Sequence, residues 1–333
     1  MTPGLAADET PKRSLALHHI SKTETLIPML RSLSELRWLL GCVLNHPANR
    51  RHRVRAVLRF AWWQLRKRLS QRPAVVRVGA NRKFKVLCDS PFSSMVVYDG
   101  LPEWDEMKFL LRVLRASDGF IDIGANVGFY TVLASTVITE GPLFAFEANP
   151  RNLEVLRDQV QLNELANAEV FGNALGNTTG ELSFFDSGRE TGSIATEGDS
   201  GAKVITVPCR RLDDCLAGRS LPDYVVAKMD VEGCEALVLE GAVAAMQSGR
   251  ISVWLFELND IALCKHGSSG EKLIEAFSKH GYSILYWDEE HRRLGTKGDG
   301  RDANRENYVA CREVEALRAR LNAGLDTGSD SSD

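Results

Sequence analysis

Long apolar runs are missing from this chain of 333 residues. None approaches the ~20 consecutive apolar residues that cross a bilayer as a helix. The N-terminal stretch MTPGLAADETPKRSLALHH also lacks the basic start and apolar core of a secretory signal. These absences predict a soluble cytoplasmic protein, with peripheral attachment to the inner face of a membrane as the alternative.

Cysteines at the spacing of a metal site or a redox pair are also missing. The chain has seven cysteines, but no CxxC pair and no Cys/His spacing typical of a zinc site. An odd, dispersed set of this kind predicts reduced thiols rather than a disulfide framework. We therefore expect no structural metal site.

A strong net charge is absent too, since the formal charge is only −3. This gives no general case for a nucleic-acid partner. The charge is nevertheless uneven, because residues 31–72 are basic and Glu35 is the only acid among them. Residues 326–333 are acidic and rich in Ser and Gly, which is typical of a solvated tail.

The dinucleotide fingerprint G-x-G-x-x-G does not occur where the chain opens its first strand–turn–helix unit. That unit is Phe120–Thr131, which reads FIDIGANVGFYT: a short apolar run, a glycine-containing turn and a helix-like continuation. Gly124 and Gly128 lack a Cβ, so the backbone can bend sharply and approach a ligand closely. Asn126 is one of the few other residue types that tolerate positive φ. The pattern predicts a nucleotide-binding turn.

Strand and helix patterns alternate after this turn, which predicts one doubly wound, mostly parallel α/β sheet with an antiparallel strand at its end. We expect strands at residues 120–123, 143–146, 169–172, 224–229, 251–257, 283–287 and 307–310. We expect helices at residues 103–114, 152–165, 236–247, 270–280 and 312–321. A hairpin of strands 181–185 and 203–207 around the Gly/Ser/Thr-rich stretch 188–201 completes the prediction.

Four segments follow from these patterns. They are a flexible N-terminus (1–22), a helical arm with a small β appendage (23–100), the α/β domain (101–311), and a terminal helix with a disordered tail (312–333). Within the second segment we expect helices at 25–43 and 51–69 and strands at 75–78, 83–88 and 94–98. The arm either packs on the main domain or offers a basic amphipathic surface to anionic lipid or an assembly partner.

Polar residues at the ends of the second and third strands predict the nucleoside site. Glu147 ends the second strand, where an acid commonly accepts hydrogen bonds from the two ribose hydroxyls. Its alternative role is a carboxylate stabilised by the following helix dipole. Asp122 precedes the glycines, which suits a ligand with a cationic amino-acid end, such as S-adenosylmethionine. At the third strand end, Asn173 and the backbone around Ala174 either read an adenine edge or form an ordinary turn at the end of the strand.

Charges also interrupt the apolar fourth strand, VVAKMDVEGCEALVLEGA. Lys228, Asp230 and Glu232 cluster at its carboxyl end, where ligands bind in open α/β sheets. Asp230 could act as a general base on an acceptor hydroxyl, or help to bind a divalent cation with Glu232 or Glu257. Lys228 could instead simply pair with Asp230 or Glu232.

The motifs FIDIGANVGFYT, FAFEANP, NALGN, VPCRRLDD and KMDVEGCEALVLEGA together resemble the FkbM family of S-adenosylmethionine-dependent methyltransferases. The resemblance implies a class I methyltransferase fold with a seven-stranded sheet. It implies that Asp122, Gly124, Asn126 and Gly128 hold the methionine part of the cofactor and Glu147 its ribose. It also implies that Asp230 lies beside the reactive methyl group. Asn149, Asn173 and Ala174 complete the predicted cofactor site. Ala148 departs from the proline usual in this motif.

The resemblance implies methylation of a hydroxyl on a sugar, a glycan or a small glycosylated metabolite. Asp230 is the expected base, with Lys228 and Glu232 beside it. Two alternatives remain open: a methyltransferase acting on nitrogen or carboxylate, and a non-catalytic nucleoside-binding scaffold that docks through residues 31–72. The sequence does not predict the oligomeric state or the identity of the acceptor.

Overall fold

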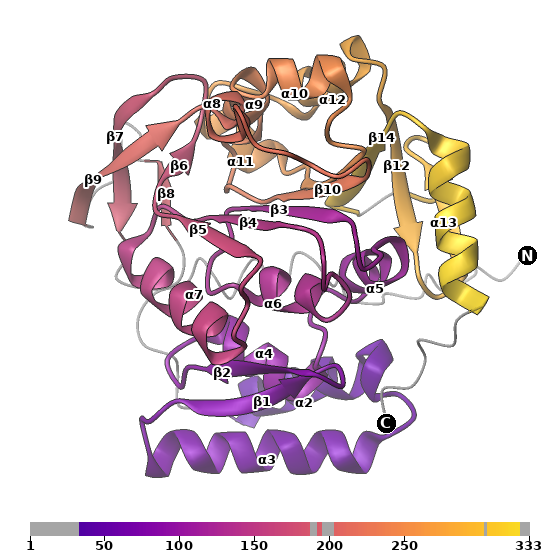
Figure 1. Ribbon diagram of the computed structural model, residues 1–333. Helices are drawn as coiled ribbons and strands as arrows, with labels where there is room; N and C mark the ends of the chain where they lie inside the picture. The colour runs from indigo at the N-terminus through magenta and orange to yellow at the C-terminus, as the bar shows by residue number, and fades with distance from the viewer. Residues whose placement is uncertain (1–32, 187–191, 195–202, 303–304, 327–333) are drawn as a thin grey trace, which may run out of the picture.

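The computed structural model describes residues 33–186, 192–194, 203–302 and 305–326 (Figure 1). The expected flexible N-terminus (1–22), the start of the first arm helix, most of the glycine-rich stretch 188–201 and the end of the tail fall outside these residues.

The central sheet has eight strands in the order β13-β12-β14-β11-β10-β3-β4-β5. Five neighbouring strands, β11 to β5 in that order, run parallel. Strand β14 lies between β11 and β12 and is antiparallel to both. This order fits the class I methyltransferase fold that the resemblance implies, with β13 as one further edge strand beyond the seven expected. The strands are β3 (Gly119–Ile123), β4 (Leu143–Phe146), β5 (Ala168–Phe171), β10 (Val225–Met229), β11 (Val253–Glu257), β12 (Ser283–Asp288), β13 (Arg293–Thr296) and β14 (Asn307–Cys311).

Helices cover both faces of this sheet (Figure 1). Successive strand residues point to opposite faces, so Phe120 joins one apolar core and Ile121 the other. Both faces are covered, which is why the parallel strands are continuous apolar runs. One face carries α5 (Trp104–Val113), α6 (Phe129–Ser135), α7 (Pro150–Leu162) and α13 (Val314–Asp326). The other carries α8 (Leu212–Leu216), α9 (Glu235–Glu240), α10 (Val243–Ser248), α11 (Asp260–Lys265) and α12 (Gly270–Lys279).

A smaller sheet flanks the main one in the order β6-β9-β7-β8. Its strands β7 (Gly180–Asp186) and β9 (Lys203–Arg210) form the predicted antiparallel hairpin. Strand β8 (Gly192–Ile194) pairs with β7, and β6 (Ala174–Leu175) pairs with β9. The short strand β6 therefore links this sheet to the third strand end of the main one.

The strand expected at residues 94–98 is wrong. This segment belongs to a helix, α4 (Pro91–Asp99). Ser90 caps the helix, because its Oγ accepts a hydrogen bond from the backbone N–H of Ser93 (2.8 Å). Pro91 occupies the first helical position, where its missing N–H costs nothing. The β-branched residues of this stretch suggested a strand, but the cap and the proline outweigh them.

The single helix expected at residues 236–247 is also wrong, since the structure breaks it into α9 and α10. A Cβ at Gly241 would lie 2.0 Å from the carbonyl oxygen of Gly176, so the chain turns there against another loop. Asp213 then restarts the helix. Its carboxylate accepts hydrogen bonds from two backbone N–H groups in the first turn of α10 (2.8 and 2.9 Å).

The N-terminal arm consists of α2 (Leu33–Asn45), a 3₁₀ turn η1 (Pro47–Asn49), α3 (Arg53–Leu69) and the hairpin of β1 (Ala74–Val78) and β2 (Arg82–Val86). Ala56, Phe60 and Trp63 of α3 are buried in the same apolar core as α5 and α6. Among the described residues, no helix has the length and apolar character needed to cross a membrane.

Hydrogen bonds join the arm to the end of α4 and to the segment between α4 and α5. The side-chain amide of Asn49 donates to the carboxylate of Asp99 (2.8 Å), and a ring nitrogen of His46 lies 3.3 Å from the carbonyl oxygen of Pro102. The His46 ring also meets the edge of the Trp104 ring, with centroids 5.9 Å apart. The arm therefore holds the chain on both sides of Glu103.

Candidate functional site

The charged residues singled out in the sequence meet at the carboxyl edge of the sheet. Four neighbouring strands, β4, β3, β10 and β11, end there side by side. The register of β3 and β10 sets Asp122 opposite Lys228. Glu147 directly follows β4, Asp230 directly follows β10, and Glu257 is the last residue of β11. Acids at four strand ends thus share one edge.

Lys228 is the cation at the centre of this edge and is only 6% exposed. Its Nζ donates to Oδ2 of Asp230 (2.7 Å) and lies 4.5 Å from the centroid of the Tyr130 ring. The Tyr130 hydroxyl in turn donates to the Glu103 carboxylate. Burial by itself lowers the pKa of Lys228, but Asp230, Glu103 and Asp122 outweigh it and raise the pKa above its usual value. Lys228 is therefore firmly protonated.

Asp122 lies beneath the glycine turn and is 1% exposed. One carboxylate oxygen accepts a hydrogen bond from the Thr131 hydroxyl (2.6 Å), which ties β3 to the first turn of α6. Burial raises the pKa of Asp122 to about 6, although Lys228 opposes the shift. A cation above the turn would further favour the ionised form.

Glu147 fastens two loops together. Its Oε2 accepts a hydrogen bond from the backbone N–H of Asn126 (2.7 Å), and its Oε1 accepts one from the backbone N–H of Asn149 (2.6 Å). The Asn149 side chain caps α7 by accepting from the backbone N–H of Arg151 (3.0 Å). Burial raises the pKa of Glu147 to about 7, against the effect of these N–H groups. Glu147 thus fixes the glycine turn against the start of α7.

The glycines of the turn are required by backbone geometry. Gly124 has φ +77° and Gly128 has φ +83°. A Cβ at Gly124 would lie 2.0 Å from the carbonyl oxygen of Asp230, and one at Gly128 would lie 2.6 Å from a methyl carbon of Leu156. Asn126 between them has φ +50°. The space next to both glycines is therefore filled by protein, in addition to any ligand that the turn faces.

Replacing Gly124 by Ala should destabilise the fold by roughly 2–4 kcal/mol, because the new Cβ meets backbone atoms as well as an unfavourable φ. Gly218 offers a matched control, since it has φ +71° with nothing within 4 Å of a Cβ. Gly218→Ala should cost only about 1 kcal/mol. Urea unfolding of both variants measures the difference. Equal losses would show that the contact with Asp230 has no effect.

The side-chain amides of Asn126 and Asn173 differ in their hydrogen bonding. Within the described part of the chain, Oδ1 of Asn126 is buried without a hydrogen-bond partner, although buried polar atoms are normally paired. A donor on a bound molecule would satisfy it. Asn173 is buried and its Nδ2 donates to the carbonyl oxygen of Ala174 (2.8 Å). Asn173 therefore stabilises the turn into β6 as well as facing the third strand end.

Further acids surround the β10–α9 loop. Glu232 has φ +53° and precedes Gly233 with φ +99°, while Glu235 accepts hydrogen bonds from the backbone N–H groups of Val231 (3.1 Å) and Gly233 (3.3 Å). Loss of hydration, with repulsion from Asp230 and Glu232, raises the pKa of Glu257 well above its usual value. Among the described residues, no group of three or more His, Cys, Asp or Glu side chains is arranged to hold a metal ion.

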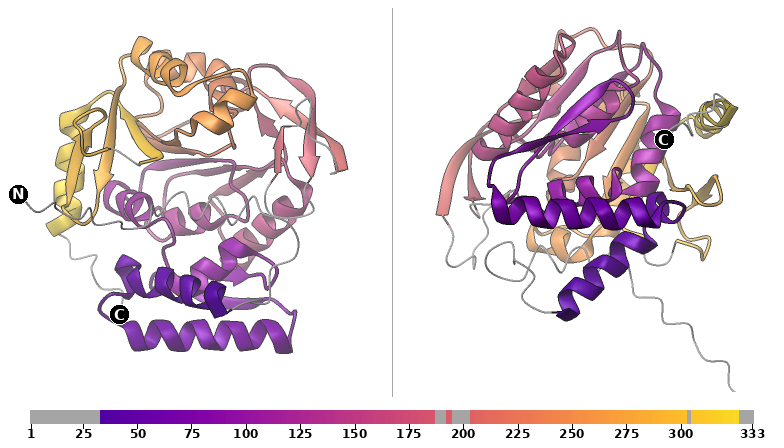
Figure 2. Two further views of the ribbon diagram at one scale, coloured as in Figure 1. Left: turned by 180° about the vertical axis from the view of Figure 1, so that it is seen from behind. Right: turned by 90° about the horizontal axis from the view of Figure 1, so that it is seen from below.

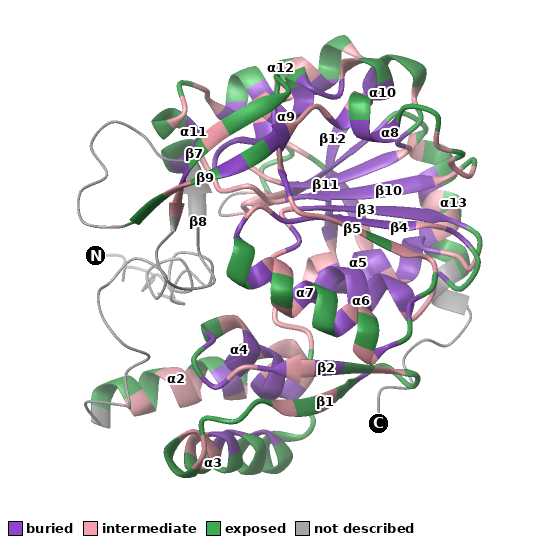
Figure 3. Cartoon of the chain, turned by 60° about the vertical axis from the view of Figure 1, so that its left-hand side comes forward, coloured by how far each residue is buried: buried purple, intermediate pink, exposed green. Residues whose placement is uncertain are grey.

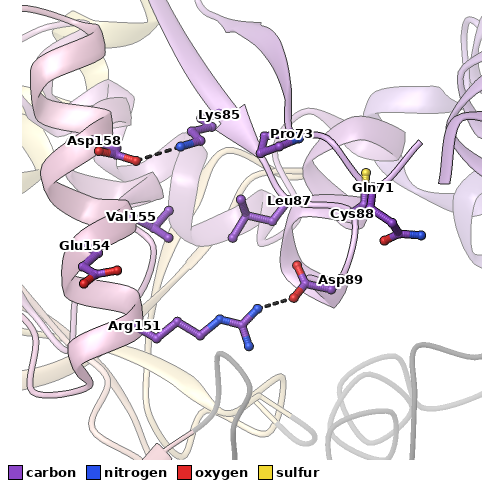
Figure 4. A pocket seen from close by; sticks show the side chains of 10 residues that line it. All are labelled: Gln71, Pro73, Lys85, Leu87, Cys88, Asp89, Arg151, Glu154, Val155 and Asp158. Atoms are coloured by element: carbon purple, nitrogen blue, oxygen red, sulfur yellow. Dashed lines mark hydrogen bonds and ion pairs between the residues drawn. The ribbon is translucent and has the colours of Figure 1, made fainter.

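A separate groove of about 440 Å³ lies between α7 and the chain that follows β2 (Figure 4). Four of its charged side chains pair across the groove, Arg151 with Asp89 and Lys85 with Asp158. None of the acids at the strand ends lines it. The chemistry of the sheet edge therefore makes that edge, and not this groove, the candidate active site.

The family model described as the methyltransferase FkbM domain matches residues 122–284. This part of the chain is an FkbM-family methyltransferase domain. The hexuronic acid methyltransferase AglP of Haloferax volcanii is 30% identical over 151 residues, which are 44% of this chain and 59% of that protein. The alignment thus spans less than two thirds of the relative's length.

Two solved structures are similar to the chain that contains this FkbM domain. A methyltransferase FkbM from Methylobacillus flagellatus KT is 15% identical, with a TM-score of 0.38 over 78% of this chain and 59% of that one. A precorrin-6y C5,15-methyltransferase from Geobacter metallireducens is 16% identical, with a TM-score of 0.35 over 62% of this chain and 86% of that one. The strand order itself carries the assignment of the fold.

Sequence reasoning missed two members of the site. Glu103 lies before the matched FkbM domain, and Tyr130 lies in the helix-like continuation of the turn, where nothing in the sequence indicated a role in the site. The one signal was indirect: a lysine inside a buried strand needs counter-charges. Lys228 therefore implied a further acid, but nothing in the sequence indicated that Glu103 would supply it.

Proposed function

We propose that this chain is an S-adenosylmethionine-dependent methyltransferase that methylates a hydroxyl oxygen on a sugar, a glycan or a small glycosylated metabolite. The observation that carries the proposal is the edge of an FkbM domain at which Glu147, Asp122 and Asp230 end neighbouring strands. The relative named for a hexuronic acid supports a sugar-type acceptor.

The residues at this edge fit S-adenosylmethionine. The Glu147 carboxylate would accept hydrogen bonds from the ribose hydroxyls, in the position that such an acid takes in related sheets. Asp122 would supply negative charge beneath the cationic methionine end, which is held by the turn from Gly124 to Gly128. The unpaired Oδ1 of Asn126 would accept from the ammonium group. Asn149, Asn173 and Ala174 would complete the adenosine side.

When bound, the cofactor supplies a methyl group that its sulfonium has already activated. The chain's own task is to align the acceptor hydroxyl and to take its proton. Asp230 would accept that proton. Its Oδ2 is paired with Lys228, whereas no hydrogen bond to Oδ1 occurs among the described residues. Lys228 would hold the Asp230 carboxylate in place through this hydrogen bond, and Glu232 would lie beside the acceptor.

Isothermal titration with S-adenosylmethionine tests the cofactor part of the proposal. The parent should bind, and Glu147→Ala should bind roughly 10–100-fold more weakly, since hydrogen bonds to a charged group are lost. Glu154→Ala is the matched control, because Glu154 is exposed on α7, the helix that follows Glu147. Its affinity should equal that of the parent.

No heat of binding with the parent would contradict the methyltransferase proposal. Equal affinity of the parent and Glu147→Ala would contradict the ribose assignment alone. A glucuronic acid glycoside is the first acceptor to assay, with release of S-adenosylhomocysteine as the readout.

A further inference from the structure

The outward face of α3 is apolar along its whole length. Six side chains on it are exposed: Val54 (74%), Val57 (38%), Leu58 (63%), Trp62 (48%), Leu65 (55%) and Leu69 (77%). The helix buries only Ala56, Phe60 and Trp63, which lie on the opposite side at helical spacing. Apolar side chains directly opposite the core are unusual on a protein surface and mark a site of interaction.

Basic side chains flank this apolar stripe on both sides. At helical spacing, Arg55, Arg59 and Arg66 lie along one flank, and Arg53 and Arg68 along the other. The helix RVRAVLRFAWWQLRKRL contains no acidic residue. Among the described residues, Arg53, Arg55 and Arg68 form no ion pair. Within α3, the charged residues that border the stripe are therefore all cations.

The shape of the surface is convex. Figures 1 and 2 show α3 lying along the outer edge of the molecule, and Figure 3 shows its outer side exposed and its inner side buried. The helix of 17 residues is about 25 Å long. A straight, protruding stripe of this kind fits a flat surface rather than a pocket.

We propose that α3 docks this protein on an anionic lipid surface, lying in the plane of the interface. The apolar side chains would enter the boundary between headgroups and acyl chains, and the flanking guanidinium groups would remain among the phosphates. Trp62 is suited to that depth, and the Arg66 guanidinium already lies 5.9 Å from its ring centroid. The proposal is independent of the methyltransferase activity.

The charge around the stripe favours an anionic bilayer over a second copy of this chain as the partner. A second copy docked stripe to stripe would bring two rows of arginines together without an acid between them, which is unfavourable. An anionic bilayer offers an apolar layer bordered by negative charge, in the same arrangement as the stripe and its flanks. Phe60 and Trp63 anchor the helix in the core, so its outer face stays outward when the protein docks.

Vesicle co-sedimentation of the full chain tests the proposal. The parent should pellet with vesicles of equal parts phosphatidylcholine and phosphatidylglycerol, and not with phosphatidylcholine alone. Leu58→Glu with Leu65→Glu should weaken this binding at least about 10-fold, since two charges enter the interface. The matched control is Ile261→Glu with Val204→Glu, two exposed apolar residues elsewhere (68% and 53%), and it should bind like the parent. Thermal unfolding confirms that both variants fold.

Tryptophan fluorescence gives a second measurement. Binding to vesicles with brominated acyl chains should quench the parent, and Trp62→Phe should remove most of that quenching. A parent that stays in the supernatant with anionic vesicles would overturn the proposal. Parent-like binding by Leu58→Glu with Leu65→Glu would do the same. A dimer that these two substitutions dissociate, without vesicle binding, would assign the stripe to a second copy instead.

Discussion

Asp230→Asn is expected to lower kcat by roughly 10²–10⁴-fold while leaving the affinity for S-adenosylmethionine within about twofold of the parent. The substitution keeps the size of the side chain, and its amide oxygen can still accept a hydrogen bond from Lys228. It removes only the ability to take the proton of the acceptor. The rate of S-adenosylhomocysteine release with the uronic acid glycoside, together with isothermal titration, separates the two effects.

Asp158→Asn provides the control for this variant. Asp158 is an exposed aspartate on α7 that also pairs with a lysine, Lys85, at 2.7 Å. Its conversion should leave kcat unchanged. If Asp230→Asn also kept the parental rate, Asp230 would not be the base, and the acceptor proton would leave to water or to another acid at the edge.

Lys228→Met is expected to destabilise the fold by about 3–5 kcal/mol near neutral pH, because it leaves acids near Lys228 without their cation. The side chains concerned are those of Asp230, Glu103 and Asp122. Protonation of Glu103 and Asp122 can relieve this repulsion, since Lys228 lowers the pKa of both carboxyl groups and its loss would raise them. The loss should therefore shrink as the pH falls from about 8 to about 5. Urea unfolding at both pH values measures it.

Lys85→Met is the matched control. The Lys85 side chain is 30% exposed and forms its ion pair with Asp158 near solvent. Removing it should cost less than about 1 kcal/mol. A similar loss in both variants, or a loss in Lys228→Met that did not depend on pH, would mean that Lys228 acts mainly through packing.

Much of the sheet could be predicted because each strand is encoded by its own short run of residues. Parallel strands covered on both faces are continuous apolar runs, so β3, β4, β10 and β11 stand out in the sequence. Charged residues at the ends of such runs stand out as well, which is how Asp122, Glu147 and Asp230 were found. The same reasoning indicated the positive φ now seen at Asn126.

The parts that could not be predicted depend on distant partners. Asp213 caps the start of α10 although it lies 30 positions before the first residue of that helix. The sequence of the helix itself therefore gives no sign of the break between α9 and α10. The Glu103–Tyr130 hydrogen bond joins residues 27 positions apart and forms only once α5 has packed beside α6. In α4, a cap and a proline decided between helix and strand where side-chain propensity pointed the wrong way.

The link between the arm and the segment around Glu103 limits how this protein can be recombined with its relatives. Asn49 and His46 contact Asp99 and Pro102 before Glu103, and the His46 ring contacts Trp104 after it. Glu103 in turn helps to balance the charge of Lys228. A chimera that joined a foreign arm to this domain at residue 100 would replace His46 and Asn49 but keep Glu103. A junction placed after Trp104 would move all three residues together. Only the second junction keeps Glu103 together with the arm residues that contact its neighbours.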